Sequence, residues 1–231
     1  MTLLLSAIAP ILFVLIFIYL MDKYEKEPIH LLLFSFFLGA IVSIIVTTLL
    51  YVIIDIPLPL HNNYSVFQQF IKAFFVVGIT EEFSKYIIVR YYAQPHEEFN
   101  EPFDGIVYAV MVSMGFAATE NIMYVLQSGF ETAIIRAFTA VPAHATFAIL
   151  MGYFLGKAKF SKNKTLWNLT GLLLAALFHG AYDFFLFIDF IPGLWVGALL
   201  ALFVGIILAR KAIKRHQMNS HFRVVSKDDI L

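Results

Sequence analysis

Long apolar runs alternate with short polar segments along the chain. Seven of these runs are long enough, at 1.5 Å per residue, to cross the roughly 30 Å hydrocarbon core of a bilayer. The predicted spans cover residues 3–21, 30–54, 67–90, 104–127, 132–156, 166–187 and 192–209, with Asp104 as the predicted N-cap of the fourth. The pattern predicts an all-α, polytopic transmembrane helical bundle of about seven spans.

Composition supports this fold class. The chain has 231 residues, of which 61% are hydrophobic and 14% charged, and its mean hydropathy is +0.83. A soluble domain carries about 45–50% apolar and about 25% charged residues. The zero net charge argues against a general nucleic-acid binder, and the lack of cysteine excludes disulfides and a cysteine nucleophile. We expect one transmembrane domain over residues 1–209 and a cytoplasmic polar tail over residues 210–231.

The distribution of Lys and Arg predicts the orientation of the bundle. Thirteen of the sixteen Lys and Arg residues fall in the loops after the first, third and fifth spans or in the tail. Positively charged loops remain on the cytoplasmic side. The amino terminus is therefore predicted to lie outside and the carboxyl terminus in the cytoplasm.

The third predicted span, which contains VVGITEEFSKYIIVR, holds charged residues inside an apolar run. Glu81 and Lys85 are four residues apart, so one interpretation is an internal ion pair that lowers the cost of insertion. Glu82 lies about 100° around the helix from Glu81, and the two are not expected to point at Lys85 together. One carboxylate is then left without a partner, which favours a general base.

Three later spans carry further polar residues at overlapping depths. Glu120 and Asn121 follow a small-residue surface in the fourth span, where another helix can approach closely. His144 comes two residues after a Pro, and His179 and Asp183 are four residues apart on one helix face. Packing explains Asn121 equally well, and a self-neutralising pair explains His179 with Asp183. Taken together, the four spans predict one shared site in the outer half of the membrane.

These motifs, in this order and spacing, resemble the PrsW family of bacterial intramembrane proteases over nearly the whole chain. The motifs are DKYEKEP after the first span, EEFSK, FDGIVYA leading to GFAATEN, HATF and HGAYD. The family is similar in turn to CAAX prenyl-endopeptidases and bacteriocin-processing proteins, where an EE pair and two His carry peptide hydrolysis. This sequence differs from that group's commoner pattern at Lys85, where an Arg one residue later is usual, and at Asp183, where Asn is frequent.

The resemblance implies a multi-pass protein of the bacterial cell membrane that cuts a membrane-anchored anti-sigma factor near the outer face. This first cut would lead to release of the sigma factor in an envelope-stress response. The implied partners are this single-span substrate and the lipid bilayer, without nucleic acid. The implied catalytic residues are Glu81, Glu82, His144 and His179, with Lys85, Glu120, Asn121 and Asp183 in support.

Two mechanisms stay open for such a site. In the first, Glu81 or Glu82 activates water while a His stabilises the oxyanion, without a metal. In the second, His144, His179 and either Glu82 or Glu120 hold a Zn²⁺ cofactor, with a Glu as base. The sequence lacks the HExxH signature of many zinc peptidases, which favours the first mechanism slightly.

Two other classes use the same residues differently. A proton- or ion-coupled transporter or channel would use the intramembrane Glu and His residues as a relay. The sequence shows no paired halves or interrupted spans of the kind found in many transporters. A sensor subunit would bind the anti-sigma factor without cutting it. The motifs favour the protease over both.

Overall fold

The computed structural model describes residues 2–222, and every regular element within them is a helix. The first half forms α1 (Thr2–Met21), α2 (Ile29–Leu38), η1 (Gly39–Ser43), α3 (Ile44–Asp55), α4 (Val66–Ile71), η2 (Lys72–Gly78), α5 (Ile79–Ile88) and η3 (Val89–Ala93). The second half forms α6 (Asp104–Ser128), α7 (Phe130–Phe138), α8 (Ala140–Lys159), α9 (Lys164–Phe187) and α10 (Val196–Met218). The η elements are short π-helical segments that continue the adjoining α-helices.

Within residues 2–222, six helical stretches are long and apolar enough to cross a membrane. The predicted span 67–90 is not one of them, although the chain is helical from Val66 to Ala93. The predicted span 67–90 differs from the other spans in its charge, since it contains Glu81, Glu82 and Lys85. The predicted all-α polytopic bundle is confirmed, and about seven spans is close to what the structure shows.

The predicted span 132–156 is divided into two helices. α7 ends at Phe138, α8 begins at Ala140, and Thr139 between them has φ −123° and ψ −77°, outside the helical region. Pro142 lies in the first turn of α8, where the amide hydrogen that proline lacks would have no helical partner. The break therefore precedes the proline, and α8 is continuous through the segment that carries the site.

Three predicted helix ends also differ from the structure, and one of them is the start of α10, at Val196 where residue 192 was expected. α6 starts at Asp104 itself and its N-cap is Phe103, so the prediction of Asp104 as the N-cap is wrong. α10 continues past the predicted boundary at residue 209 to Met218. Lys and Arg are good helix formers, which is consistent with this extension. Of the predicted tail, residues 223–231 lie outside the described residues.

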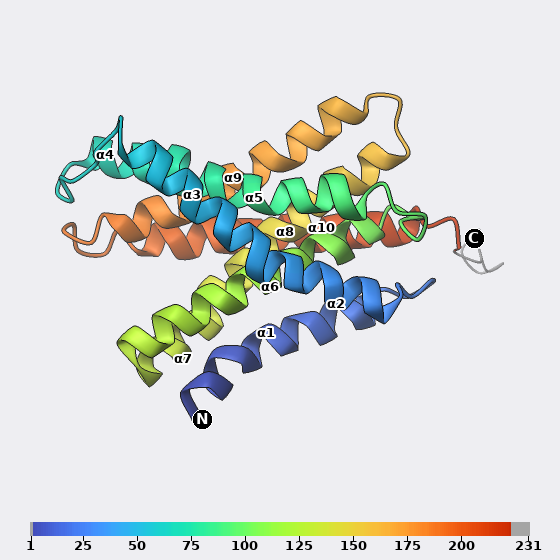
Figure 1. The fold of residues 1–231 in the computed structure, drawn as a ribbon, viewed down its shortest axis with the longest axis horizontal. Helices are drawn as coiled ribbons and strands as arrows, with labels where there is room; N and C mark the ends of the chain where they lie inside the picture. Colours follow the sequence, from blue (N-terminus) through green and yellow to red (C-terminus); the bar gives the residue numbers. More distant parts are fainter. Residues whose placement is uncertain (1, 223–231) are drawn as a thin grey trace.

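α6 is the central helix of the bundle. Its residues are buried without interruption from Asp104 to Ala118, as expected for a helix that is covered on every side. α1, α2 and α8 pack against it, and Figure 1 shows it crossing the middle of the molecule. The polar residues near its carboxyl end are thus held inside the protein.

Small residues let α6 and the α2–η1 helix approach closely. A Cβ added at Gly115 would overlap the Phe36 carbonyl, and one added at Gly39 would overlap the Val112 carbonyl. The Thr119 hydroxyl donates a 2.9 Å hydrogen bond to the carbonyl of Ala40. The predicted small-residue contact surface is therefore confirmed.

Candidate active site

The polar residues predicted in four separate spans meet in the structure. Glu81, Glu82 and Lys85 lie on α5, Glu120 on α6, His144 on α8, and His179 with Asp183 on α9. α9 packs against both α5 and α8, and α8 packs against α6. These contacts bring residues that are up to about a hundred positions apart in sequence to one place.

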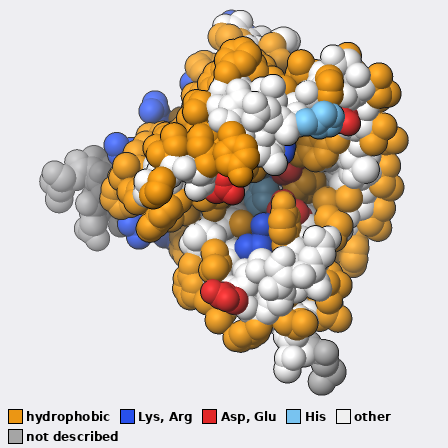
Figure 2. Space-filling model, turned by 90° about the vertical axis from the view of Figure 1, so that its left-hand side faces the viewer, with side chains coloured by type: hydrophobic (Ala, Val, Ile, Leu, Met, Phe, Trp, Pro, Cys, Tyr) orange, Lys and Arg blue, Asp and Glu red, His pale blue; other side chains and the backbone are white. Residues whose placement is uncertain are grey.

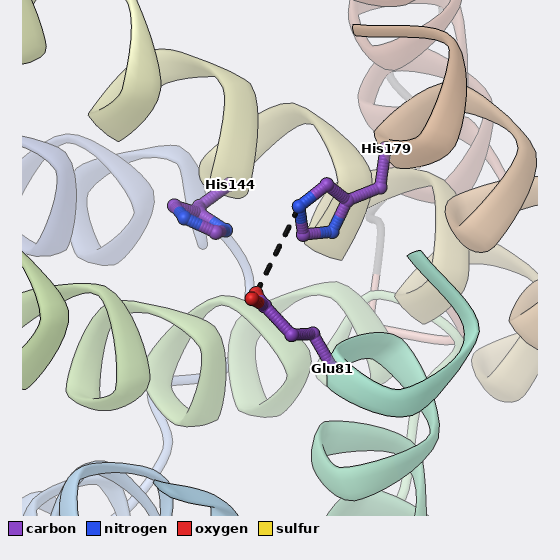
Figure 3. A group of neighbouring side chains, drawn as sticks. All are labelled: Glu81, His144 and His179. Carbon is purple, nitrogen blue, oxygen red and sulfur yellow. Dashed lines mark ion pairs between the residues drawn. The ribbon is translucent and has the colours of Figure 1, made fainter. Parts of the chain in front are cut away.

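Glu81, His144 and His179 form the centre of the site. All three are buried, and each offers a ligand atom that lies within 4.8 Å of those of the other two. Figure 3 shows the three side chains pointing toward one another from α5, α8 and α9, with the ion pair between Glu81 and His179 dashed. Glu81 Oε2 and His179 Nε2 are 3.8 Å apart.

Each histidine is oriented by a second carboxylate. His179 Nδ1 lies 2.8 Å from Glu82 Oε1, and His144 Nε2 lies 2.9 Å from Glu120 Oε2. A carboxylate that accepts one ring N–H orients the imidazole and directs the other nitrogen toward the site. His144 Nδ1 then lies 3.4 Å from the Lys85 ammonium, and His179 Nε2 lies 3.8 Å from Glu81 Oε2. Glu82 and Glu120 therefore act from outside the central group.

Lys85 lies between both glutamates of α5. Its Nζ is 2.7 Å from Glu82 Oε1 and 3.5 Å from Glu81 Oε2. The prediction that Lys85 can pair with only one of them is wrong. Glu82 precedes Lys85 by three residues and Glu81 by four, and both positions neighbour it on a helix surface. The ammonium also lies 4.2 Å from the centre of the Phe116 ring.

Lys85→Met is expected to destabilise the protein by about 3–5 kcal/mol, because it leaves two buried carboxylates without their shared cation. Unfolding of the purified protein in detergent would measure this cost. Lys72→Met is the matched control, since Lys72 is half-buried and has no ion pair within residues 2–222. It is expected to cost about 0.5 kcal/mol or less. Equal losses in the two variants would contradict the role given to Lys85.

Two residues of the site were not predicted from the sequence. Tyr51, on α3, donates a 2.8 Å hydrogen bond to Glu81 Oε1. Arg136, on α7, lies with its guanidinium 2.7 Å from Glu120 Oε2. Arg136 lies near the start of the predicted span 132–156, where a charge is expected at the membrane surface, and a polar hydroxyl in the apolar segment TTLLYVII was the available signal for Tyr51.

Asn121 and Asp183 lie at the edge of the central group. Asn121 donates to the Ala7 carbonyl of α1 at 2.7 Å and accepts from Arg136 Nε at 2.7 Å. Its contacts are thus those of a packing residue that also orients Arg136. Asp183 Oδ2 is 3.4 Å from His179 Nε2, so the predicted pair is present, on the ring nitrogen opposite Glu82.

The central group faces a pocket of about 920 Å³. Glu81, Glu120, His144 and His179 line it, whereas Glu82 is completely buried and contributes no lining. Figure 2 shows a hollow in one face of the molecule, where acidic, basic and histidine side chains lie within a largely hydrophobic surround. Such a pocket can hold an apolar peptide segment beside charged groups.

The three central residues suit a divalent metal ion. One carboxylate and two imidazoles are a ligand set of catalytic zinc sites, which keep a further position for water or substrate. Glu81 Oε2 is buried and has no hydrogen-bond partner within residues 2–222. This oxygen lies 3.8 Å from His179 Nε2 and 3.5 Å from Lys85 Nζ, so a bound metal ion would take the place of these longer contacts. The residues present therefore fit a metal.

Comparison with known proteins identifies a family. The family model described as PrsW family intramembrane metalloprotease matches residues 27–210. Protease PrsW of Oceanobacillus iheyensis is 42% identical over 182 residues, which cover 78% of this chain and 81% of the relative. Protease PrsW of Bacillus subtilis is 39% identical over 183 residues, with coverages of 78% and 81%. Protease PrsW of Clostridioides difficile is 34% identical over 230 residues, with coverages of 96% and 93%. No solved structure matches.

The match with the family agrees with the site. The matched region runs from residue 27 to residue 210 and so contains every polar residue described above from Tyr51 to Asp183. Six apolar helices within residues 2–222 agree with the bacterial, membrane-embedded relatives. The chain belongs to the PrsW family of intramembrane metalloproteases, and it is a multi-pass peptidase of the bacterial membrane.

Proposed function

We propose that this protease makes the first cut in a membrane-anchored anti-sigma factor, near the outer face of the membrane. This cut would lead to release of the sigma factor in an envelope-stress response. Peptide hydrolysis is supported by the group of Glu81, His144 and His179, which lies beside a largely apolar pocket. The substrate class follows from the family resemblance and from the position of the pocket.

The pocket extends from the reaction centre toward one end of the bundle. Its lining includes Lys72 at the start of η2, Gln127 near the end of α6, Phe187 at the end of α9 and Trp195 just before α10. The distribution of Lys and Arg predicts that these helix ends lie outside the cell. A single-span protein entering this pocket would therefore be cut near the outer side of its span.

We assign different roles to the two adjacent glutamates. Glu81 lines the pocket, so it meets water and substrate, and the Tyr51 hydroxyl orients its carboxylate. Glu82 is a positioning residue, because its Oε1 contacts His179 and Lys85 away from the pocket. We also assign Glu81 as the carboxylate ligand of the metal ion. From the sequence, Glu82 or Glu120 was expected in this role.

The chain's own residues supply the positioning and the proton chemistry. Glu120 and Glu82 hold the two imidazoles in fixed orientations, and Glu81 presents to the same point a carboxylate oxygen that accepts no hydrogen bond within residues 2–222. When bound by Glu81, His144 and His179, a zinc ion would lower the pKa of water and polarise the scissile carbonyl. The family description supports this arrangement over the metal-free alternative.

The substrate proposal is tested with purified protein in lipid vesicles and an anti-sigma factor that has one span and an outer domain. We expect two fragments, whose masses place the cut on the outer side of the span. The matched control is a single-span protein with the same outer domain but an unrelated span and flanking segment. Cleavage of the control alone would overturn the substrate class, and a cytoplasmic cut would overturn the orientation.

A further inference from the structure

A second group of carboxylates lies at the other end of the bundle. Asp22, Glu25 and Glu27 are in the α1–α2 loop, Glu101 is in the loop before α6, and Asp104 begins α6. Figure 1 shows these segments together at the right-hand end, whereas the loops on the pocket side lie at the left. The structure thus brings together two sequence motifs, DKYEKEP and FDGIVYA, that contribute no side chain to the reaction centre.

Three of these side chains converge on one point. Glu25, Glu27 and Asp104 each offer a carboxylate oxygen, and these oxygens all lie within 4.8 Å of one another. Glu27 is 2% exposed and Asp104 is fully buried. Each of the three has one buried oxygen without a hydrogen-bond partner within residues 2–222. Unpaired buried anionic oxygens are costly unless a cation binds them.

The opposite oxygens of two of these carboxylates are fixed. Asp104 Oδ2 accepts hydrogen bonds from the backbone N–H groups of Asn100 at 2.7 Å and Glu101 at 2.8 Å. The Tyr108 hydroxyl donates to Glu27 Oε2. Because one oxygen of each carboxylate is held in this way, the other is oriented before any ligand arrives. Such preorganisation is typical of a built binding site.

No Lys, Arg or His within residues 2–222 forms an ion pair with this group. Lys26, which lies between Glu25 and Glu27 in sequence, instead donates to the backbone carbonyls of Tyr19 and Asp22. Asp22 itself is fully buried, and neither of its carboxylate oxygens has a hydrogen-bond partner there.

We propose that Glu25, Glu27 and Asp104 bind a hard divalent cation, Ca²⁺ or Mg²⁺, at a site separate from the reaction centre. The donors are carboxylate oxygens alone, which these cations prefer, whereas zinc and copper sites use imidazole or thiolate. Asp22 and Glu101 add negative charge around the site. A bound cation would tie the α1–α2 loop to the first turn of α6.

Calorimetric titration of the full chain in detergent tests this site. The protein is first treated with a chelator and desalted, and Ca²⁺ and Mg²⁺ are then added separately. We expect one saturable site for at least one of the two ions. Glu25→Gln, at a half-buried position, and Asp104→Asn are expected to lower the affinity at least tenfold. The full chain is used because residues 223–231, which include Arg223 and Lys227, lie outside the described residues.

Two control variants separate this site from its surroundings. Glu97→Gln removes an exposed carboxylate from the loop before α6 and is expected to bind as the wild type does. Glu81→Gln is also expected to leave the affinity unchanged, which keeps this proposal independent of the reaction centre. Saturating Ca²⁺ or Mg²⁺ should raise the melting temperature of the wild type but not of Glu25→Gln. Absence of wild-type binding, or unchanged affinity in Glu25→Gln, would overturn the proposal.

Discussion

Replacing Glu81 by Gln is expected to lower the rate of peptide cleavage by about 10²- to 10⁴-fold, the range over which general acid–base groups contribute. The amide keeps the shape of the side chain and can still accept the hydrogen bond from Tyr51. It can no longer take a proton from water, and it is a weaker metal ligand. Lys85 keeps its 2.7 Å contact with Glu82, so the fold should survive. Fragment formation from a single-span substrate in lipid vesicles, measured by mass spectrometry, checks the rate.

Tyr51→Phe is the matched control for this variant, because it removes the hydroxyl from Glu81 while it leaves the carboxylate in place. Its rate should fall less than tenfold. Two results together would assign the role of Glu81 in catalysis to Glu82 instead. They are a Glu81→Gln rate within tenfold of the wild type and a Glu82→Gln protein that is inactive but of normal stability. Loss of folded Glu81→Gln protein would instead identify Glu81 as part of a structural ion pair.

Metal removal is expected to reduce cleavage to the background level, and micromolar Zn²⁺ should restore it. The proposed ligands converge from three helices, and three protein ligands are needed for a catalytic zinc site. His144→Ala and His179→Ala should each lower the zinc content of the purified protein well below one ion per chain. Atomic emission measurements give this content without depending on activity.

The control for the histidine variants is His61→Ala, since His61 is exposed in the loop after α3 and should leave the zinc content unchanged. The chelator should bind zinc in preference to Ca²⁺ and Mg²⁺. It then leaves any cation bound to the acidic group at the other end of the bundle in place, so that loss of cleavage reports on zinc alone. Cleavage that persists in this chelator while Glu81→Gln is inactive would establish glutamate-activated water without a metal.

The fold class and the meeting of the polar residues were predictable because both depend on distances along a helix. Apolar runs of bilayer length identify the spans, and a fixed rise per residue gives each polar residue a depth. Glu81, His144 and His179 were therefore expected at overlapping depths, and the structure has them within one group. The match with the PrsW family supports the predicted peptidase.

The lateral arrangement was not predictable, because a depth does not say which face of a helix meets which neighbour. Tyr51 and Arg136 contact the site through helices whose packing only the structure shows. The assignment of Glu82 behind His179 and Glu81 toward the pocket depends on the same information. The contact of Lys85 with both glutamates, by contrast, follows from the sequence spacing, because residues three and four positions apart are neighbours on a helix surface.

The π-helical segment η2 changes the rotational register of the helix that carries the glutamates. Lys72 and Glu81 both line the pocket although they are nine residues apart. In an uninterrupted α-helix, with 3.6 residues per turn, positions nine apart face opposite sides. The π-helical turns of Lys72–Gly78 hold more residues each than α-helical turns, and this places Lys72 and Glu81 on the same side of the helix. A one-residue deletion there would consequently rotate one wall of the pocket away from the other without altering any catalytic side chain.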